Sequence, residues 1–316
     1  MHKPKILVLM GGFSEEREVS LRSGAAVLKA LRSLGYTAEA MDLKVISIQN
    51  IINYNPDLVF IALHGKDGED GTVQGLLEIL DIPYTGSGVA SSAIGINKVL
   101  TKKLLTYEGI PTAPFLILHK SEFDSSQDVQ SLLNRIGLPM VIKAATQGSS
   151  IGTYIVQEEK NVLKAIEAAF AYDPEVLAEK FIDGTEVTST VIGNETTEVL
   201  PLIEITSTNE FYDFESKYTP GMCNHIIPAR VNEDIQNKIA ELSQRAYKSL
   251  NCLGYARVDY IIDQEGNPFV LEINTIPGMT EMSLVPDAAR AAGVGFEELV
   301  EKIVRLGMQK MSRRSK

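Results

Sequence analysis

The chain has 316 residues, of which 44% are apolar, and a mean hydropathy of +0.01, which indicates a globular protein long enough for two or three domains. Thirty lysine and arginine residues stand against 41 aspartate and glutamate residues, a net charge of −11, with no basic stripe outside the C-terminal tail, so a nucleic-acid partner is disfavoured. The two cysteines, Cys223 and Cys252, lack metal-ligand spacing and are interpreted as reduced and structural, with no zinc site.

The N-terminal segment is too poor in apolar residues for a signal peptide. Lys3-Pro4-Lys5 precedes only five apolar residues before Gly11-Gly12, and no apolar run in the chain approaches a membrane span. We therefore expect a cytoplasmic protein with no membrane partner.

The first third of the chain is predicted to alternate between strands and helices. An apolar run at residues 6–10 ends in Gly11-Gly12, and a second one covers residues 58–63. Between them lies a helical pattern of apolar residues at Leu21, Ala25, Leu28 and Leu31. This β-α-β order predicts a parallel, Rossmann-like sheet within residues 1–95. Its ligands are expected beyond the carboxyl ends of the strands, where Gly11-Gly12 and His64-Gly65 fall.

The rest of the chain is interpreted as two more units with α+β character, at residues 96–183 and 184–316. The middle unit is expected to hold helices near residues 97–108 and 128–136, and strands near 115–118, 140–144, 152–156 and 176–181. The last unit is expected to hold further strands, a polar and aromatic loop at 209–220, a long helix at 233–250, a β-hairpin and two closing helices. No Pro/Gly-rich linker separates the units, so they should pack tightly.

Two glycine-rich segments are candidates for binding phosphate. Residues 147–152, Gln-Gly-Ser-Ser-Ile-Gly, lie between two expected strands and follow Lys143, so backbone N–H groups, hydroxyls and a lysine could meet one anion. By itself, an ordinary hairpin turn explains this segment more readily. Residues 86–91 lack the third glycine of the dinucleotide-binding fingerprint, so binding of a nicotinamide cofactor is only a weak alternative. Lys98 and Lys180 are two further basic candidates, and a solvated surface position fits either.

The expected hairpin at residues 256–274 places carboxylates face to face. A four-residue turn at 264–267 sets Asp263 opposite Pro268 and Asp259 opposite Glu272. Alternation puts Val258, Tyr260, Ile262, Phe269, Leu271 and Ile273 on one apolar face.

The opposite face of this hairpin gathers Arg257, Asp259, Glu272 and Asn274, where like charges directly opposite one another destabilise a strand pair. Mg²⁺ would neutralise them, because it takes oxygen ligands from a few side chains and completes its shell with water and phosphate. A solvated face with Arg257 pairing one acid explains the hairpin equally well.

Seven groups of residues point to one known family when they are taken together, in this order and spacing. They are Glu15 to Ser20 after Gly11-Gly12, Leu63 to Gly71, Lys143 to Gly152, Glu179 to Phe181 with Gly184 and Glu186, Phe211 to Tyr218, Arg257 to Asp259, and Leu271 to Thr280 followed by Ser283 to Pro286. With them the chain resembles the D-alanine–D-alanine ligases of the ATP-grasp superfamily over nearly its whole length. The resemblance implies an N-terminal substrate-binding domain at residues 1–95 and a two-part ATP-grasp fold at 96–183 and 184–316.

The resemblance implies an enzyme with ATP and two D-alanine molecules as substrates. ATP phosphorylates one D-alanine carboxylate, and the amine of the second D-alanine attacks the D-alanyl phosphate, so that D-alanyl-D-alanine for peptidoglycan precursors, ADP and phosphate are formed. It further implies a homodimer and two Mg²⁺ ions, for which Mn²⁺ is an alternative. The ligands of these ions would be Asp259, Glu272 and Asn274.

The resemblance also assigns residues to the nucleotide and to the intermediate. Lys98 and Lys143 would hold the α- and β-phosphates, and Arg257 with the Gly278 backbone N–H would stabilise the oxyanion. The segment that binds adenine would comprise Glu179, Lys180, Phe181 and Ile182, with Glu186 on the ribose hydroxyls, and further nucleotide contacts would come from Ser149, Ser150, Lys217 and Asn274.

For the amino acids, the resemblance implies that Glu16 binds the ammonium of the first D-alanine near His64, and that Ser283 binds the carboxylate of the second. Glu16, Ser149 and Tyr218 would form a hydrogen-bonded triad that ties a mobile loop at residues 209–220 over the site and excludes water. Without the resemblance, Glu16 fits the common preference for acids at a helix N-terminus, and His64 fits a structural histidine.

The chain departs from the family pattern at two places. Ala144-Ala145-Thr146-Gln147 stands where many relatives have Pro, Ser, Arg and Glu, which changes the charge of the glycine-rich loop. Ile276 stands where several relatives have Ser. The expected metal, phosphate and oxyanion residues are all present.

Two rival functions remain. One is a related ligase that joins D-alanine to D-lactate or D-serine. Relatives that form the D-lactate product place a histidine in the mobile loop, and His225 lies seven residues beyond Tyr218. We expect His225 not to reach the acceptor. The other rival is a non-catalytic nucleotide-binding protein, which leaves the cluster of Arg257, Asp259, Glu272 and Asn274 without a role.

Overall fold

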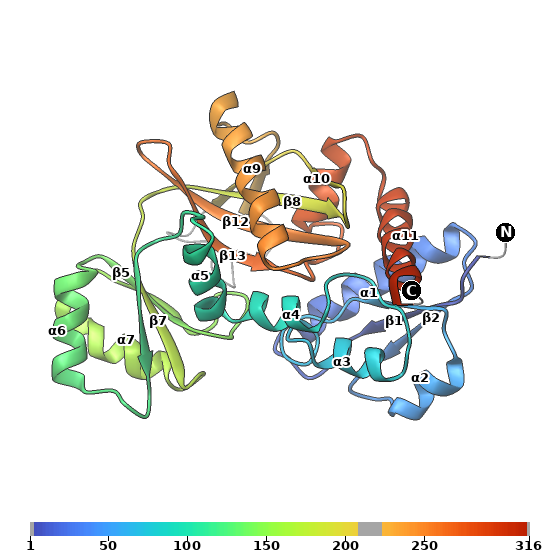
Figure 1. The fold of residues 1–316 in the computed structure, drawn as a ribbon, viewed down its shortest axis with the longest axis horizontal. Helices are drawn as coiled ribbons and strands as arrows, with labels where there is room; N and C mark the ends of the chain where they lie inside the picture. Colours follow the sequence, from blue (N-terminus) through green and yellow to red (C-terminus); the bar gives the residue numbers. More distant parts are fainter. Residues whose placement is uncertain (1–2, 208–222, 315–316) are drawn as a thin grey trace.

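The computed structural model describes residues 3–207 and 223–314, and in this part of the chain the strands form three sheets. Figure 1 shows a parallel sheet at one end of the molecule, a smaller antiparallel sheet at the other, and a larger antiparallel sheet between and above them. The three sheets fall within the three predicted units, whose boundaries stay a prediction. Among the described helices, none combines the length and apolar character needed to cross a lipid bilayer.

The parallel sheet contains the two apolar runs that the sequence predicted as strands and a third strand that was not predicted. Its central strand is flanked by the other two, in the order β2 (Ala38–Asp42), β1 (Ile6–Met10), β3 (Leu58–Ile61). The predicted parallel β-α-β arrangement is confirmed. The helices of this region are α1 (Arg17–Ser33), α2 (Ile48–Tyr54) and α3 (Thr72–Ile79).

The buried face of α1 matches the predicted one only in part, since Leu28 and Leu31 pack into the core as expected. Ala25 is exposed and Leu21 is only partly buried, whereas Ser23, Gly24 and Val27 are buried. Gly24 packs so closely against the sheet that an added Cβ would lie 2.5 Å from the Met10 side chain. Small residues on this face let the helix approach the strand, so large apolar residues alone did not reveal the whole face.

The smaller antiparallel sheet has the order β4 (Phe115–His119), β7 (Glu175–Lys180), β5 (Met140–Ala144), β6 (Thr153–Val156). One hydrophobic cluster joins the inner side chains of these strands to the helices α6 (Ser125–Arg135) and α7 (Val162–Ala169). A short 3₁₀ helix, η1 (Glu159–Asn161), precedes α7. Two helices lead into this region from the parallel sheet: α4 (Val89–Ile96) and α5 (Lys98–Tyr107).

The larger antiparallel sheet has the order β11 (Cys223–Ile226), β10 (Ile203–Ser207), β8 (Gly184–Gly193), β12 (Tyr255–Asp263), β13 (Pro268–Asn274), and β9 (Thr197–Val199) also pairs with β8. The helix α9 (Glu233–Ser249) packs its apolar stripe onto one face of this sheet. The last two helices are α10 (Leu284–Ala291) and α11 (Phe296–Arg314). The helices and strands expected in the last two thirds of the chain are therefore present.

The hairpin of β12 and β13 confirms the pairing of the two acids and corrects the rest of the register. Asp259 lies opposite Glu272, but the register then shifts, so that Ile262, and not Asp263, lies opposite Pro268. The shift leaves one extra residue, Leu271, on the second strand, which is the signature of a β-bulge.

The bulge also corrects the predicted apolar face of the hairpin. Val270 pairs with Tyr260 and is fully buried with it, whereas Phe269 and Leu271 are only partly buried and lie outside that core cluster. A bulge reverses the inward and outward alternation beyond it, because the side chains of a strand alternate with a period of two. Leu271 therefore lines a cavity on the other face of the sheet.

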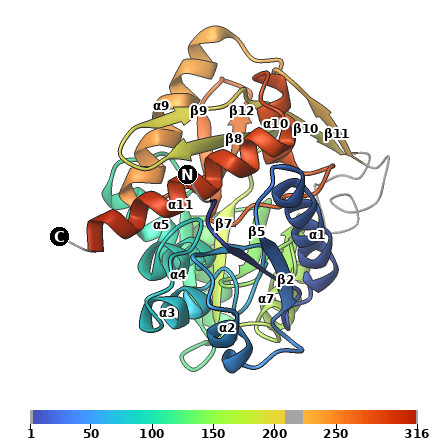
Figure 2. The same cartoon turned by 90° about the vertical axis from the view of Figure 1, so that its right-hand side faces the viewer.

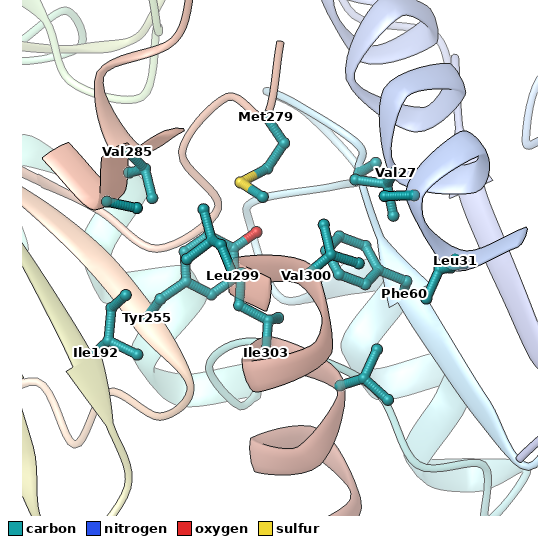
Figure 3. Packing of buried hydrophobic residues seen from close by; sticks show 14 of the residues in the cluster. Val27, Leu31, Phe60, Ile192, Tyr255, Met279, Val285, Leu299, Val300 and Ile303 are labelled. Carbon is teal, nitrogen blue, oxygen red and sulfur yellow. The ribbon is translucent and has the colours of Figure 1, made fainter. Parts of the chain in front are cut away.

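The C-terminal helix α11 joins the parallel sheet to the larger antiparallel sheet. Its side chains Leu299, Val300 and Ile303 lie between Tyr255 on one side and Phe60 on the other, and all five are buried (Figure 3). Figure 2 shows α11 running across the molecule beside α1. This packing fixes the position of the N-terminal loops relative to the strand ends of the larger sheet.

We predict that Ile303→Ala lowers the free energy of unfolding by about 2–5 kcal/mol, because it opens a cavity in a fully buried contact. Urea unfolding monitored by circular dichroism measures this change. Arg305→Ala on the same helix is the control, since the Arg305 side chain is 71% exposed, and it should cost less than about 0.5 kcal/mol. Equal effects of the two changes would contradict the role assigned to this contact.

Candidate active site

A cavity of about 460 Å³ lies between the smaller and the larger antiparallel sheets. Its walls come from the end of β7 and the segment after it, the start of β8, and the inward face of β12 and β13. This larger cavity brings together ten of the predicted residues: Lys98, Lys143, Ser150, Glu179, Lys180, Phe181, Ile182, Glu186, Asp259 and Glu272.

A smaller cavity of about 130 Å³ lies beside the larger one, between the N-terminal loops, the glycine-rich loop and the segment before α10. It brings together seven more predicted residues: Glu16, His64, Ser149, Arg257, Asn274, Gly278 and Ser283. Lys98 and Glu272 line both cavities, so the two cavities adjoin at these side chains. The predicted residues Lys217 and Tyr218, and the predicted loop at 209–220, lie outside the described residues.

Glu179 at the end of β7 carries the densest set of charges in the larger cavity. One carboxylate oxygen pairs with Lys143, and the other lies 2.7 Å from the Nζ atom of Lys102. Burial by itself would raise the pKa of Glu179, but the charges of Lys143 and Lys102 outweigh it and lower that pKa to about 2. Glu179 is therefore an anion at neutral pH, and it holds Lys143 at the cavity wall.

The two acids of the hairpin are each paired with a cation. Arg257 donates two parallel hydrogen bonds to Asp259, both 2.8 Å long, and Thr188 on β8 donates a third of 2.5 Å. The Nζ atom of Lys98 lies 3.6 Å from Glu272. These cations relieve the repulsion between facing carboxylates that the sequence predicted.

The side chains at this end of the hairpin fit a hard divalent cation. Asp259 and Glu272 offer carboxylate oxygens directly across the strand pair, and Asn274 offers an amide oxygen that accepts a hydrogen bond of 2.9 Å from the Ile276 backbone. In residues 3–207 and 223–314, no cluster of three or more His, Cys, Asp or Glu side chains is arranged to hold a metal. Two carboxylates and an amide suit an ion such as Mg²⁺, which draws its remaining ligands from water and phosphate.

The glycine-rich loop lies against the N-terminal loop and adopts an unusual backbone. Ser149 and Ser150 have φ values of 50° and 63°, in the left-handed region that such residues rarely occupy. The Ser149 hydroxyl donates a short hydrogen bond to Glu16. A Cβ atom at Gly148 would lie 2.7 Å from the same carboxylate, so a larger residue here would displace the Glu16 side chain. Strained residues held by such contacts are common at ligand-binding loops.

The start of this loop segment is anchored by two side chains. Lys98 donates a hydrogen bond of 2.6 Å to the Gln147 carbonyl. Asp173 accepts hydrogen bonds from both the backbone N–H and the hydroxyl of Thr146, at 3.0 and 2.5 Å. The stretch where the sequence departs from the family pattern thus has its own anchor to the adjacent turn.

His64 lies buried at the back of the smaller cavity. Its Nδ1 atom is 3.1 Å from the Ile276 carbonyl and 3.4 Å from Glu69, and its Nε2 atom is 3.3 Å from the Ser23 hydroxyl. Burial lowers the pKa of His64, but the hydrogen bond and charge of Glu69 outweigh it, so the net pKa is raised. The Ser23 oxygen also accepts a hydrogen bond of 3.1 Å from the Met279 backbone.

Ser283 stands directly before α10 and lines the smaller cavity together with His64. Its hydroxyl oxygen accepts a hydrogen bond of 3.0 Å from the Thr280 backbone and lies 2.8 Å from the Thr280 hydroxyl. A Cβ atom at Gly278 would lie 2.8 Å from the same oxygen, so the backbone here passes close to Ser283. The Ser283 hydroxyl and the Gly278 backbone therefore lie side by side at the wall of the smaller cavity.

Several residues of the site were not predicted from the sequence. Lys102 lies one helical turn after Lys98 on α5, and that spacing was a usable signal. Glu69 lies within the motif Leu63 to Gly71, but neither its type nor its spacing indicated a role, and Ser23 and Thr188 gave no local signal. The alternative fingerprint at residues 86–91 serves packing, since Ser91 donates a hydrogen bond of 2.9 Å to the Asn251 carbonyl.

Known families match most of the chain. Residues 104–305 match the family described as D-ala D-ala ligase C-terminus, and residues 43–87 match D-ala D-ala ligase N-terminus. A D-alanine–D-alanine ligase from Pelotomaculum thermopropionicum is 53% identical over 309 residues, which cover 96% of this chain and 97% of that protein. The ligase from Desulforamulus reducens is 50% identical, covering 96% and 99%.

Solved structures agree with these matches. The crystal structure of the D-alanine–D-alanine ligase from Bacillus anthracis has a TM-score of 0.86 and 36% identity, covering 98% of this chain and 99% of that one. A structure of the Bacillus anthracis ligase complexed with ATP has a TM-score of 0.85 and 34% identity, with the same coverage. The chain therefore belongs to the D-alanine–D-alanine ligase family and has its ATP-grasp fold.

Proposed function

We propose that this protein joins two D-alanine molecules to D-alanyl-D-alanine, with ATP converted to ADP and phosphate, for peptidoglycan precursor synthesis. The observation that carries the proposal is the junction of the two cavities at Lys98 and Glu272. A nucleotide in the larger cavity and amino acids in the smaller one would meet there. Membership of the ligase family supports the same reaction.

The chemistry requires a phosphoryl transfer followed by an attack of an amine. In the larger cavity, Lys98 and Lys143 would hold phosphates and the segment after β7 would bind adenine. In the smaller cavity, Glu16 would bind the ammonium of the first D-alanine, and Ser283 the carboxylate of the second. The first carboxylate would then point toward the junction, where it takes the phosphoryl group from ATP.

The second D-alanine must lose a proton before its nitrogen can attack the acyl phosphate. The attack converts the carbonyl into a tetrahedral oxyanion, and phosphate leaves as the amide bond forms. Arg257 and the Gly278 N–H, both at the smaller cavity, would stabilise this oxyanion. The partial burial of these donors strengthens each interaction, since less water competes with them.

Mg²⁺ would be held by Asp259, Glu272 and Asn274, as their donor types allow. When bound, such ions neutralise phosphate charge and orient the transferred group. The resemblance also supports a homodimer and a cytoplasmic location, which belong to the proposal.

The choice of D-alanine as the acceptor is favoured over D-lactate by the surroundings of His225. Its Nδ1 atom lies 2.7 Å from Asp287 on α10, and His225 is not among the residues that line the two cavities in the described part of the chain. A histidine held by a carboxylate on α10 would not present its cation to the acceptor's ammonium.

Phosphate release and product analysis test the proposed reaction. Purified protein with ATP and Mg²⁺ should release phosphate with D-alanine, and much less with L-alanine, D-serine or D-lactate. Mass spectrometry should find D-alanyl-D-alanine as the main product from pH 7 to 9 when D-alanine and D-lactate are equal. A dominant D-lactate product at pH 7 would favour the rival ligase, and nucleotide binding without ADP release would favour a non-catalytic protein.

We predict that Glu272→Gln abolishes detectable turnover while the protein remains folded. The change removes one charge from a facing carboxylate pair, so it weakens the binding of Mg²⁺ and relieves repulsion at the same time. Electron paramagnetic resonance of Mn²⁺ in the presence of ADP should show weaker ion binding. The exposed Glu265→Gln, at the tip of the same hairpin, should leave both properties unchanged. Near-normal activity of Glu272→Gln at saturating Mg²⁺ would refute the metal assignment.

We predict that Arg257→Ala lowers kcat by about two powers of ten or more, with a much smaller change in KM, because its donors act mainly in the transition state. Arg257→Lys should recover little, since lysine cannot donate the two parallel hydrogen bonds seen at Asp259. Steady-state kinetics with a thermal melt of each variant separates the effects. A loss of stability with normal kcat in the folded fraction would make Arg257 structural.

A further inference from the structure

Lys102 on α5 is a buried cation that lines neither of the two cavities in the described part of the chain. Its side chain is 1% exposed, and the side chain of its partner Glu179 is 2% exposed. Lysine is rarely buried to this extent unless it is paired, because removing its charge from water is costly. The formation of α5 alone does not require a lysine at this buried position.

The Lys102 ammonium has two hydrogen-bond acceptors, Thr112 and Ala113, and one ion-pair partner, Glu179. Its Nζ atom lies 2.7 Å from Glu179, 2.6 Å from the Thr112 hydroxyl and 3.4 Å from the Ala113 carbonyl. The lysine therefore joins α5 to β7 and to the segment that leads into β4. This geometry defines one position for the Glu179 carboxylate.

Glu179 transmits that position to the larger cavity. Its second oxygen pairs with Lys143, whose ammonium stands at the cavity wall. If Lys102 were neutral, one oxygen of Glu179 would lose its partner, and the carboxylate could turn toward Lys143 or toward the cavity. The place of the Lys143 charge therefore depends on a lysine that does not reach the cavity.

A second connection runs from Lys102 to the hairpin. The Thr112 hydroxyl that accepts from Lys102 donates a hydrogen bond of 2.8 Å to the Val270 carbonyl on β13. The Val270 N–H in turn donates to the Pro111 carbonyl at 2.8 Å. Val270 stands two residues before Glu272, so the same lysine supports both walls of the larger cavity.

We propose that Lys102 is a positioning residue for the nucleotide: it orients Glu179, which places the Lys143 ammonium for the phosphates of ATP, and through Thr112 it braces the hairpin strand that carries Glu272. The inference rests on the proposed function for the identity of the nucleotide. Lys102 acts through these partners and does not touch ATP.

Lys102→Met, which keeps the length and apolar stem of the side chain, tests this inference. The KM for ATP, and its Kd measured by calorimetry without D-alanine, should rise about tenfold, because a buried carboxylate loses one of its two cations. The KM for D-alanine should change less than about twofold. Lys103→Met, at the exposed neighbouring position on α5, is the matched control and should leave all these values unchanged.

A lower melting temperature with unchanged ATP affinity in Lys102→Met would overturn the inference, since a purely structural lysine predicts that result. An equal rise in the KM for D-alanine would overturn it as well. Wild-type protein that binds ATP but releases no phosphate with D-alanine would refute the proposed function and leave the affinity comparison valid.

A double substitution keeps the test decisive if Lys102→Met fails to fold. Lys102→Met combined with Glu179→Gln leaves no uncompensated carboxylate, and it is compared with Glu179→Gln alone. If Lys102 acts through the charge of Glu179, the two proteins should bind ATP with affinities within about twofold of each other, as expected for coupled residues. An additional loss of about fivefold or more in the double variant would show that Lys102 acts by another route.

Discussion

Three carboxylates at the meeting point of two sheets, two of them buried and one partly buried, are the constraint on which the site depends. Glu179, Asp259 and Glu272 lie on strands whose inward faces form one cavity, and each is matched by a cation from another part of the chain or from the same strand. A buried ion without its partner costs several kcal/mol, so the strands, α5 and the glycine-rich loop are held in the arrangement that keeps the charges paired. Removing one partner affects elements far apart in the sequence.

The fold was predictable wherever hydrophobic pattern and strand length agreed. The apolar runs of β1 and β3 were recognisable by their length and composition, and the long helix α9 by its helical period. The pairing of Asp259 with Glu272 in the hairpin was predicted correctly. The bulge at Leu271 was not, and it places the side chains between the bulge and the turn on the opposite face from the predicted one. A bulge depends on packing from both sides of the sheet, which a strand's own residues do not reveal.

The site was predictable to the extent that its residues form motifs. The resemblance supplied roles that residue types alone left open. Glu16, for example, could equally have been one of the acids that are common at helix N-termini. Lys102, Ser23 and Thr188 were missed for a common reason, which is that each contacts a partner at least 71 residues away in sequence, namely Glu179, Met279 and Asp259 respectively. Such contacts exist only after the sheets have assembled. Of these residues, Lys102 alone had a local signal, its spacing of one helical turn from Lys98.

The pairing of charges also bears on how a nucleotide would enter. Carboxylates already pair with the cations of Lys98, Lys143 and Arg257 in the structure. The phosphates of a nucleotide would therefore have to compete with these carboxylates for the same cations. Nucleotide binding would be an exchange, in which phosphate oxygens replace Glu272 at Lys98 while divalent cations take up the released carboxylate oxygens. Each exchange leaves the local charge nearly balanced, which keeps the desolvation cost low. Glu179 differs from the hairpin acids in this respect, because its second cation, Lys102, is sealed away from the cavity and can anchor the carboxylate while the other pairs rearrange.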